Sequence, residues 1–118
     1  MATIVNLDRS ELQRRRRSRA LQQAGYRVLE ASHELQAVDF VVSGPVDMIV
    51  CGAEQSLPLL GELRWAAPSI PLICISSPGR VEAGLEQAAI VLENPVSTEE
   101  LVAWVDTELM LHQAVANL

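Results

Sequence analysis

The chain has 118 residues, 49% of them hydrophobic, and a formal net charge of −6. This length and hydrophobic content are typical of a folded domain with one core, and they exclude a disordered chain. No apolar run approaches the roughly 20 residues that span a bilayer, and the N-terminus lacks the basic and apolar regions of a secretory signal. We therefore expect one domain over residues 1–118, located in the cytoplasm and not in a membrane.

The N-terminal part of the chain predicts a strand, a helix and a second strand. Residues 3–7 (TIVNL) form a short apolar run, as in a strand. Ser10, with Gln13 three residues later, has the spacing of a helix capping box, and Gly25 is suited to end that helix. The segment YRVLEA, residues 26–31, alternates as a second strand.

The middle of the chain continues this alternation. A helix is predicted at residues 34–42, before the helix-breaking pair Gly44-Pro45, and a strand at residues 46–51. The next helix covers residues 57–67. The inner face of the first of these helices is expected to contain Leu35, Val38 and Val42.

The C-terminal part predicts two more strands and two more helices. Residues 71–76 and 90–93 are short apolar runs, and a helix interrupted by Gly84 is predicted between them at residues 80–88. The last helix, residues 97–115, opens with a second capping box. Five strands that each precede a helix indicate an α/β domain, with a parallel sheet covered on both faces.

No catalytic or metal-binding motif is visible in the chain. There is no glycine-rich phosphate loop after the first strand, and the spacings of the common hydrolase, metalloprotease and redox motifs are missing. His33 and His112 are isolated, and we expect both at the surface. Cys51 and Cys74 lie inside apolar runs and are expected to be buried core thiols. We therefore predict a protein that is not an enzyme.

The charge is unevenly distributed along the chain. Residues 1–30 carry seven arginines and three acids, residues 31–118 carry two arginines and twelve acids, and there is no lysine. Five of the arginines lie in residues 14–19 (RRRRSR). Because successive helical residues point about 100° apart, this run does not form one basic face. We interpret it as a solvated helix, with a partner-docking surface as the alternative, and we do not expect a nucleic-acid site.

Five segments of the chain resemble response-regulator receiver domains, the chemotaxis-type phosphoacceptor fold. The segment DRSELQRR, which follows the first strand, resembles the family's D-D-S-x-x-x-R opening. The segment AGYRVLEA resembles the family's A-G-Y-x-V-x-x-A segment. VDMIVCG resembles the P-D-L-I-L-L-D strand, PSIPLICISS the P-x-I-P-V-I-x-L-T-A segment, and ENPVSTEELVAWV the K-P-F-S-P-E-E-L-L-x-x-V ending. The resemblance covers nearly the whole chain and implies a flavodoxin-like (βα)5 three-layer sandwich with strand order 2-1-3-4-5.

The resemblance also implies where the family's functional positions lie. They are the two metal-binding acids, the phosphoacceptor, the hydroxyl residue and the lysine, which correspond here to Asp8, Arg9, Gly52, Ser76 and Asn94. Only Asp8 and Ser76 keep their chemical type, and Asp8 is at most a single metal ligand. We therefore expect the Mg²⁺ site to be lost and no cofactor to be bound. A register shifted by two residues would place Asn6 and Leu7 at the acids, which also removes the acid pair.

Two of these positions have more than one interpretation. Gly52 is an erased phosphoacceptor, a glycine that permits a tight turn at the strand end, or both. Arg9 is either a solvated residue or a cation that pairs with Asp8 in the place of the metal ion, which would lock the site without phosphate.

The resemblance further implies an interaction surface. Receiver domains commonly dimerise or dock partners through the region that corresponds here to residues 80–88, 90–93 and 97–115, so a homodimer through this region is a candidate. Trp104 is expected at the edge of a buried stripe of Leu101, Val105 and Leu109, either as a docking anchor or as a core-edge residue. The family's aromatic switch residue is replaced by Val91. The candidate surface residues are Val91, Trp104, Arg14 and Arg15.

The function expected from these residues is that of an atypical receiver domain, or pseudo-receiver. It would act in bacterial signal transduction as a phosphorylation-independent protein–protein interaction module, with a signalling protein or an output domain as partner. One alternative is a genuine phosphorelay receiver with a displaced acceptor, such as Asp8 or Glu54. Another is a receiver-like domain that binds a small molecule over the erased site.

Overall fold

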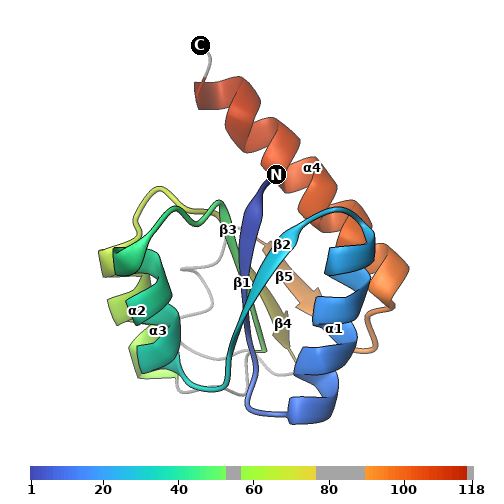
Figure 1. Ribbon diagram of the computed structural model, residues 1–118, viewed down its shortest axis with the longest axis horizontal. Coiled ribbons are helices and arrows are strands. Elements are labelled where there is room, and N and C mark those ends of the chain that lie inside the picture. Colours follow the sequence, from blue (N-terminus) through green and yellow to red (C-terminus); the bar gives the residue numbers. More distant parts are fainter. Residues whose placement is uncertain (53–56, 77–89, 117–118) are drawn as a thin grey trace.

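The computed structural model of the protein describes residues 1–52, 57–76 and 90–116. In this part of the chain, strands and helices alternate, and all five predicted strands are present (Figure 1). The elements are β1 (Thr3–Leu7), α1 (Glu11–Gln23), β2 (Arg27–Ala31), α2 (Glu34–Ser43), β3 (Met48–Gly52), α3 (Leu57–Ala66), β4 (Leu72–Ser76), β5 (Ile90–Glu93) and α4 (Thr98–Ala116). The predicted helix at residues 80–88 lies outside the described residues.

The five strands form one parallel sheet with the order β2-β1-β3-β4-β5. Helices α1 and α4 cover one face of the sheet, and α2 and α3 cover the other (Figure 1). This arrangement confirms the predicted flavodoxin-like sandwich and strand order. Because the chain order reverses at β1, the carboxyl ends of β1 and β3 lie side by side, which is where open α/β sheets usually hold their functional site.

Alternation along the strands divides the core into two layers. In β1, Ile4 points to the α1 and α4 side, whereas Val5 and Leu7 point to the α2 and α3 side. The first layer also contains Leu21, Met48, Val50, Ile73, Ile75, Leu92, Leu101 and Val105. The second contains Ala31, Ala37, Val46, Ile49, Cys51, Leu63, Leu72 and Cys74. Each large side chain buried in this way contributes about 1.5–3 kcal/mol, so the central strands hold both layers together.

The predicted ends of α1 are confirmed. The Ser10 hydroxyl accepts a hydrogen bond from the Gln13 backbone N–H at 3.3 Å, as a helix cap does. After the helix, Gly25 has a φ of +98°, a left-handed conformation that suits glycine, and its N–H donates to the Gln22 carbonyl. These two signals therefore fix the turn that leads from β1 into α1 and the turn that leads on to β2.

The predicted inner face of α2 is wrong in two of its three residues. Leu35 and Val42 are 61% and 67% exposed, whereas the helix buries Glu34 and Ala37 and packs Val38 against the core. The helix begins at Glu34, and residues 34, 37, 38 and 41 lie on one side at the spacing of helical turns. The segment has apolar residues on two sides, so its apolar pattern alone did not determine which side faces the sheet.

The last helix follows its predicted pattern. Leu101 and Val105 are buried, Leu109 packs against the same layer, and Trp104 lies at the edge with 38% of its surface exposed. The Ser97 hydroxyl accepts a hydrogen bond from the Glu100 N–H at 3.0 Å, which caps the helix. The C-terminal turns of α4 extend past the sheet (Figure 1). Within the described ranges, no helix combines the length and apolarity needed to cross a membrane.

Candidate functional site at the strand ends

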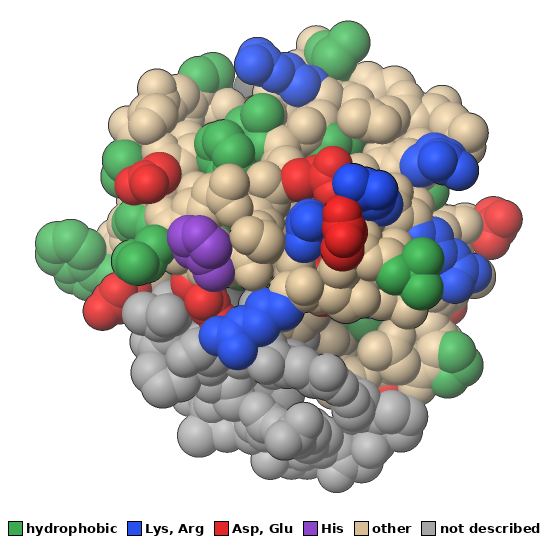
Figure 2. Space-filling model, turned by 60° about the horizontal axis from the view of Figure 1, so that its bottom comes forward, with side chains coloured by type: hydrophobic (Ala, Val, Ile, Leu, Met, Phe, Trp, Pro, Cys, Tyr) green, Lys and Arg blue, Asp and Glu red, His purple; other side chains and the backbone are tan. Residues whose placement is uncertain are grey.

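The carboxyl ends of β1, β3, β4 and β5 meet at one edge of the sheet. Leu7 pairs with Cys51, which places Asp8 beside Gly52. At the next strands, the Asn94 N–H donates a hydrogen bond to the Ser76 carbonyl at 2.8 Å. The structure therefore brings Asp8, Gly52, Ser76 and Asn94 to one edge of the sheet, and Figure 2 shows acidic and basic side chains gathered at this end of the molecule.

Asp8 is paired with an arginine that the sequence did not single out. Arg17 Nη1 lies 2.5 Å from Asp8 Oδ2, and both residues are only 8% exposed. The second carboxylate oxygen, Oδ1, accepts a hydrogen bond from the Ser10 backbone N–H at 2.8 Å. Both oxygens of the carboxylate are thus bonded to donors, and its charge is balanced by a guanidinium within the same chain.

The backbone of Asp8 is held by a second arginine. Arg14 Nη1 donates to the Asp8 carbonyl at 2.9 Å, and Arg14 Nε donates to Glu30 Oε1 at 3.2 Å. The Asp8 N–H donates to the Ala31 carbonyl at 3.0 Å, which continues the pairing with β2. Arg14, proposed from the sequence as a surface residue for partners, instead clamps the turn after β1 to the end of β2.

A buried asparagine connects β1 to α1 behind these arginines. Asn6 is fully buried, and its Nδ2 group donates to the Arg14 carbonyl at 2.8 Å and to Ser18 Oγ at 2.9 Å. Its Oδ1 atom has no partner among the described residues. Because Asn6 anchors the first turns of α1, it helps to set the position from which Arg17 reaches Asp8.

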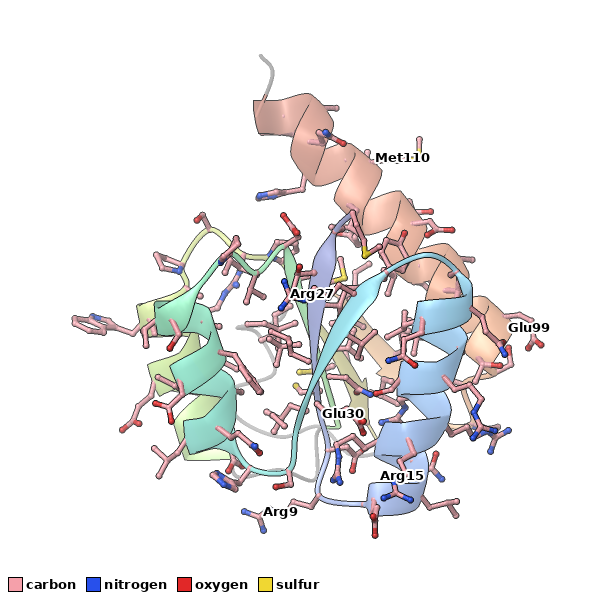
Figure 3. The ribbon with its side chains drawn as sticks, viewed as in Figure 1. Arg9, Arg15, Arg27, Glu30, Glu99 and Met110 are labelled. Carbon is pink, nitrogen blue, oxygen red and sulfur yellow. The ribbon has the colours of Figure 1, made fainter. Side chains whose placement is uncertain are left out.

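Of the two interpretations of Arg9, the structure agrees with the solvated residue and not with the pairing to Asp8. Arg9 is exposed, its Nη2 atom lies 3.7 Å from Glu34 Oε1 at the start of α2, and its side chain points away from the sheet (Figure 3). Arg17 takes the place beside Asp8 because it lies on the inner side of α1, one turn after Arg14 and one turn before Leu21. That spacing is the signal in the sequence that identifies Arg17.

Gly52 lies so close to Asp8 that a side chain at this position would force the carboxylate to shift. A Cβ atom at this position would lie 2.9 Å from Asp8 Oδ2 and 3.4 Å from Asp8 Cγ. Gly52 is the last residue of β3 and its φ is not positive, so a left-handed turn does not explain the glycine. The close approach to the Asp8–Arg17 pair is a further reason for a glycine here, and the two interpretations from the sequence, an erased phosphoacceptor and a turn at the strand end, stay predictions, since residues 53–56 lie outside the described residues.

A cavity of about 530 Å³ opens at this end of the sheet. It lies beside the Asp8–Arg17 pair and is bordered by both apolar and polar side chains. Ser76, directly before the undescribed stretch 77–89, is itself buried at the end of β4. The lining residues are Asp8, Ser10, Gln13, Arg17, Ile75, Asn94 and Pro95.

Several solved structures are similar to this chain over nearly its whole length. A response-regulator receiver domain protein from Clostridium thermocellum has a TM-score of 0.86 at 18% identity and covers 98% of this chain and 99% of its own. A CheY-like receiver domain protein from Methanospirillum hungatei JF-1 has a TM-score of 0.86 at 14% identity and covers 97% and 98%. TrrA from Thermotoga maritima, solved in complex with Mg²⁺–BeF, has a TM-score of 0.80 at 21% identity and covers 91% and 98%. The chain has the fold of a response-regulator receiver domain.

The likeness to receiver domains concerns the fold. No protein-family model matches the chain, and no curated protein matches it at a significant level. The receiver fold does not by itself give this chain the chemistry of its neighbours, because function depends on the residues at the site. The residues at the strand ends therefore decide what this receiver fold can do.

The donors at the strand ends do not suit the Mg²⁺ ion that the receiver resemblance implies. Mg²⁺ requires near-octahedral oxygen ligands, usually with carboxylates. Asp8 is bonded to the Arg17 guanidinium, and the next position carries a second cation, Arg9. Gly52 offers no side-chain oxygen. Over residues 1–52, 57–76 and 90–116, no three His, Cys, Asp or Glu side chains are grouped so that they could hold a metal ion.

The two cysteines are buried, as predicted, and they are in contact. Cys51 and Cys74 are register partners on β3 and β4, and their Sγ atoms are 3.1 Å apart. The hydrogen bond with Cys74, together with burial, raises the pKa of Cys51 well above its usual range. The same hydrogen bond lowers the pKa of Cys74. The sequence predicted burial of the thiols but not their contact, which depends on the register between the strands.

The histidines lie at the surface, as predicted, and the outer arginines of the 14–19 run are exposed. His33 is exposed and caps α2, with Nδ1 accepting from the Gln36 N–H at 3.3 Å, and His112 is exposed on α4. Arg15 pairs with Glu11 in the same helix at 2.8 Å. The remaining arginines of the 14–19 run, Arg16 and Arg19, are exposed and have no ion pair within the described residues.

Proposed function

We propose that the protein is a pseudo-receiver, a domain that acts in bacterial signal transduction as a phosphorylation-independent protein–protein interaction module. The observation that carries this proposal is the buried ion pair between Asp8 and Arg17. In this pair the guanidinium supplies the positive charge that a receiver domain otherwise obtains from a metal ion. The negative charge of Asp8 is therefore compensated without Mg²⁺ and without phosphate.

Gly52 supports the same proposal from the neighbouring strand. It occupies the position of the phosphoacceptor, and glycine has no group that accepts a phosphoryl group. A side chain at this position would meet the Asp8 carboxylate, so the loss of the acceptor and the Asp8–Arg17 pair depend on each other. Asn94, at the position of the family's lysine, removes a third part of the reaction's usual machinery.

The proposal is tested by attempting the reaction. The full chain is incubated with acetyl phosphate or with beryllofluoride, in each case with Mg²⁺, and analysed by intact mass and by Mg²⁺-dependent changes in amide chemical shifts. We expect no phosphoryl adduct and no shift changes at the strand ends. A stoichiometric, Mg²⁺-dependent adduct would contradict the proposal, and peptide mapping would then show whether Asp8 or Glu54 is a displaced acceptor. Glu54 lies outside the described residues.

A second candidate function rests on the cavity at the strand ends. Its volume of about 530 Å³ is large enough for a small molecule, and Arg17, Asn94 and Ser10 place polar groups on its wall. In this reading the chain binds a polar metabolite beside the Asp8–Arg17 pair. A screen of anionic metabolites by thermal shift tests it, because a ligand that binds only the folded state raises Tm. A Tm unchanged by every compound, in the wild type and in Asn94→Ala alike, would count against this candidate.

The partner of the proposed module is a signalling protein, an output domain or a second copy of the chain. Trp104 on α4 and Val91 on β5 remain candidates for the contact, because their side chains are 38% and 42% exposed. Arg14 is held within the chain by Asp8 and Glu30, whereas Arg15 is exposed and stays a candidate together with Arg16 and Arg19. Sedimentation of the wild type and of Trp104→Ala tests the homodimer: a dimer that Trp104→Ala dissociates supports it, and a wild-type monomer contradicts it.

A further inference from the structure

Two thiols lie in contact in the core, one on each of two neighbouring strands. Cys51 on β3 and Cys74 on β4 are register partners, so their side chains project to the same face of the sheet. Their Sγ atoms are 3.1 Å apart, and both side chains are fully buried in the layer that faces α2 and α3. The contact is therefore fixed by the pairing of two central strands.

The positions of the two residues suit a disulfide bond. Neighbouring strands lie about 4.7–4.9 Å apart, which falls within the Cα separation of about 4.4–6.8 Å that disulfides span. The sulfur atoms need to approach from 3.1 Å to about 2.05 Å for the bond to form. The chain has only these two cysteines, so neither has another partner within the molecule.

The hydrogen bond between the thiols gives them different roles. Either sulfur can donate this hydrogen bond, and the contact lowers the pKa of Cys74 and raises that of Cys51. The thiolate is the reactive form of cysteine. Cys74 is therefore the thiol that reacts first with an oxidant, and Cys51, still protonated and in contact, is placed to react with the product.

We infer that Cys51 and Cys74 form a reversible redox site, in which a peroxide converts the contacting thiols into a disulfide between β3 and β4. The Cys74 thiolate attacks one peroxide oxygen, the O–O bond breaks, hydroxide leaves, and Cys74 becomes a sulfenic acid. The Cys51 sulfur then attacks the Cys74 sulfur, and the S–O bond breaks to release water. In total, two thiols lose two electrons and two protons, and one peroxide is reduced to two waters.

This redox site goes beyond the proposed interaction function and does not depend on it. Cys51 directly precedes Gly52, and Cys74 lies two residues before Ser76. A cross-link between them ties together the two strand ends that border the Asp8–Arg17 pair. Because both thiols are buried, peroxide reaches them through local opening of the structure, so the reaction is slow compared with that of an exposed thiol.

The test uses the full chain and hydrogen peroxide. Samples are quenched, unfolded, alkylated at any remaining thiol and analysed by mass and peptide mapping. We expect a species that has lost two hydrogens, carries no alkyl group and contains a peptide cross-linked between positions 51 and 74, and we expect dithiothreitol to restore both thiols. Two thiols that remain alkylatable, a sulfinic acid at one of them, or cross-links only between molecules would overturn the inference.

Matched variants test the order of the two steps. In Cys51→Ser, the first step is retained and the second is lost, so we expect a sulfenic acid at Cys74 that dimedone traps. In Cys74→Ser, only Cys51 remains, and burial still raises the pKa of its thiol, so we expect its oxidation to be slower by about tenfold or more. Equal rates in the two variants would overturn the assignment of Cys74 as the attacking thiol. Peptide mapping of the wild type decides the disulfide itself, even if a variant does not fold.

Discussion

Helix α1 carries arginines on two faces, and the two faces differ in what they do. On the inner face, Arg14 and Arg17 reach the end of β1 and hold the backbone and the carboxylate of Asp8. On the outer face, Arg16 and Arg19 are exposed and unpaired within the described residues. Four arginines in a row are therefore not one feature. Successive residues of a helix point about 100° apart, so each arginine has different surroundings, and those surroundings determine its role.

The two faces also differ in the energy they contribute. Removing one partner of a buried ion pair leaves an uncompensated charge and costs about 3–5 kcal/mol. An exposed arginine contributes between nothing and about 1 kcal/mol. The first face thus determines the structure of the site, and the second is available for solvent or for a partner.

The largest expected effect comes from the inner face. Arg17→Met keeps the length of the side chain and removes its charge, so Asp8 loses its buried counter-ion. We expect the free energy of unfolding to fall by about 3–5 kcal/mol, measured by urea denaturation. Asp8→Asn combined with Arg17→Met should recover part of this loss, because no unpaired charge remains. An Arg17→Met variant as stable as the wild type would contradict the role of the pair.

Gly52 gives the next largest effect. Gly52→Ala places a Cβ 2.9 Å from Asp8 Oδ2, and we expect a loss of about 1–3 kcal/mol from overpacking. Gly61→Ala on the exposed side of α3 is the matched control, since nothing lies within 4 Å of its Cβ. We expect that control to stabilise the protein by about 0.5–1 kcal/mol. Equal changes in the free energy of unfolding for Gly52→Ala and Gly61→Ala would contradict the close approach between Gly52 and Asp8.

Tyr26 packs against the core layer that contains α1 and α4, and the pKa of its hydroxyl gives the next prediction. Burial, and next the hydrogen bond that its hydroxyl donates to Asp106, raise the pKa of Tyr26 from 10.0 to about 12. A raised phenol pKa means that the folded state favours the protonated form. The stabilisation is therefore complete below pH 10 and is lost as the pH rises from 10 to about 12.

Ultraviolet titration of the phenol checks this prediction. We expect Asp106→Asn to lower the pKa of Tyr26, though not fully to 10.0, because burial remains the larger cause. Tyr26→Phe should cost about 1 kcal/mol at neutral pH, the usual net value of one hydrogen bond. Glu99→Gln, an exposed acid of the same helix, is the control and should leave the titration unchanged. A Tyr26 pKa that Asp106→Asn does not move would contradict the hydrogen bond.

The outer face of α1 gives the smallest expected effect. Arg16→Gln with Arg19→Gln should change the free energy of unfolding by less than about 0.5 kcal/mol, because both side chains are exposed and unpaired among the described residues. The same double variant is expected to weaken the binding of any partner that docks on this face. A loss of stability similar to that of Arg17→Met would show that the two faces do not differ.

Much of the fold was readable from the sequence because local signals agreed with one another. The apolar run at 90–93 matches β5 residue for residue, and Ser10 and Gly25 mark the ends of α1. The inner face of α2 was not readable, because apolar residues occur on two sides of that helix. Side-chain packing between α2 and the sheet makes the choice, and that information is not local.

The sequence predicted how the backbone places the site residues, but it did not predict their ion pairs. The order of the strands places Asp8 beside Gly52, and this followed from the segment pattern. The partner of Asp8 did not follow, because Arg9 is adjacent in sequence but points away, whereas Arg17 is distant in sequence and reaches back. Which of several arginines meets a carboxylate depends on helix phase and side-chain reach, and a run of identical residues obscures both.

The close approach between Gly52 and Asp8 limits which residues position 52 accepts. An aspartate there would enter the space beside the Asp8 carboxylate and bring a second negative charge to one guanidinium. If the chain is the pseudo-receiver proposed above, a phosphoacceptor at 52 therefore requires more than one substitution, because the Asp8–Arg17 pair has to rearrange as well. In evolutionary terms, positions 17 and 52 are then epistatic, since the effect of an acid at one depends on the residue at the other.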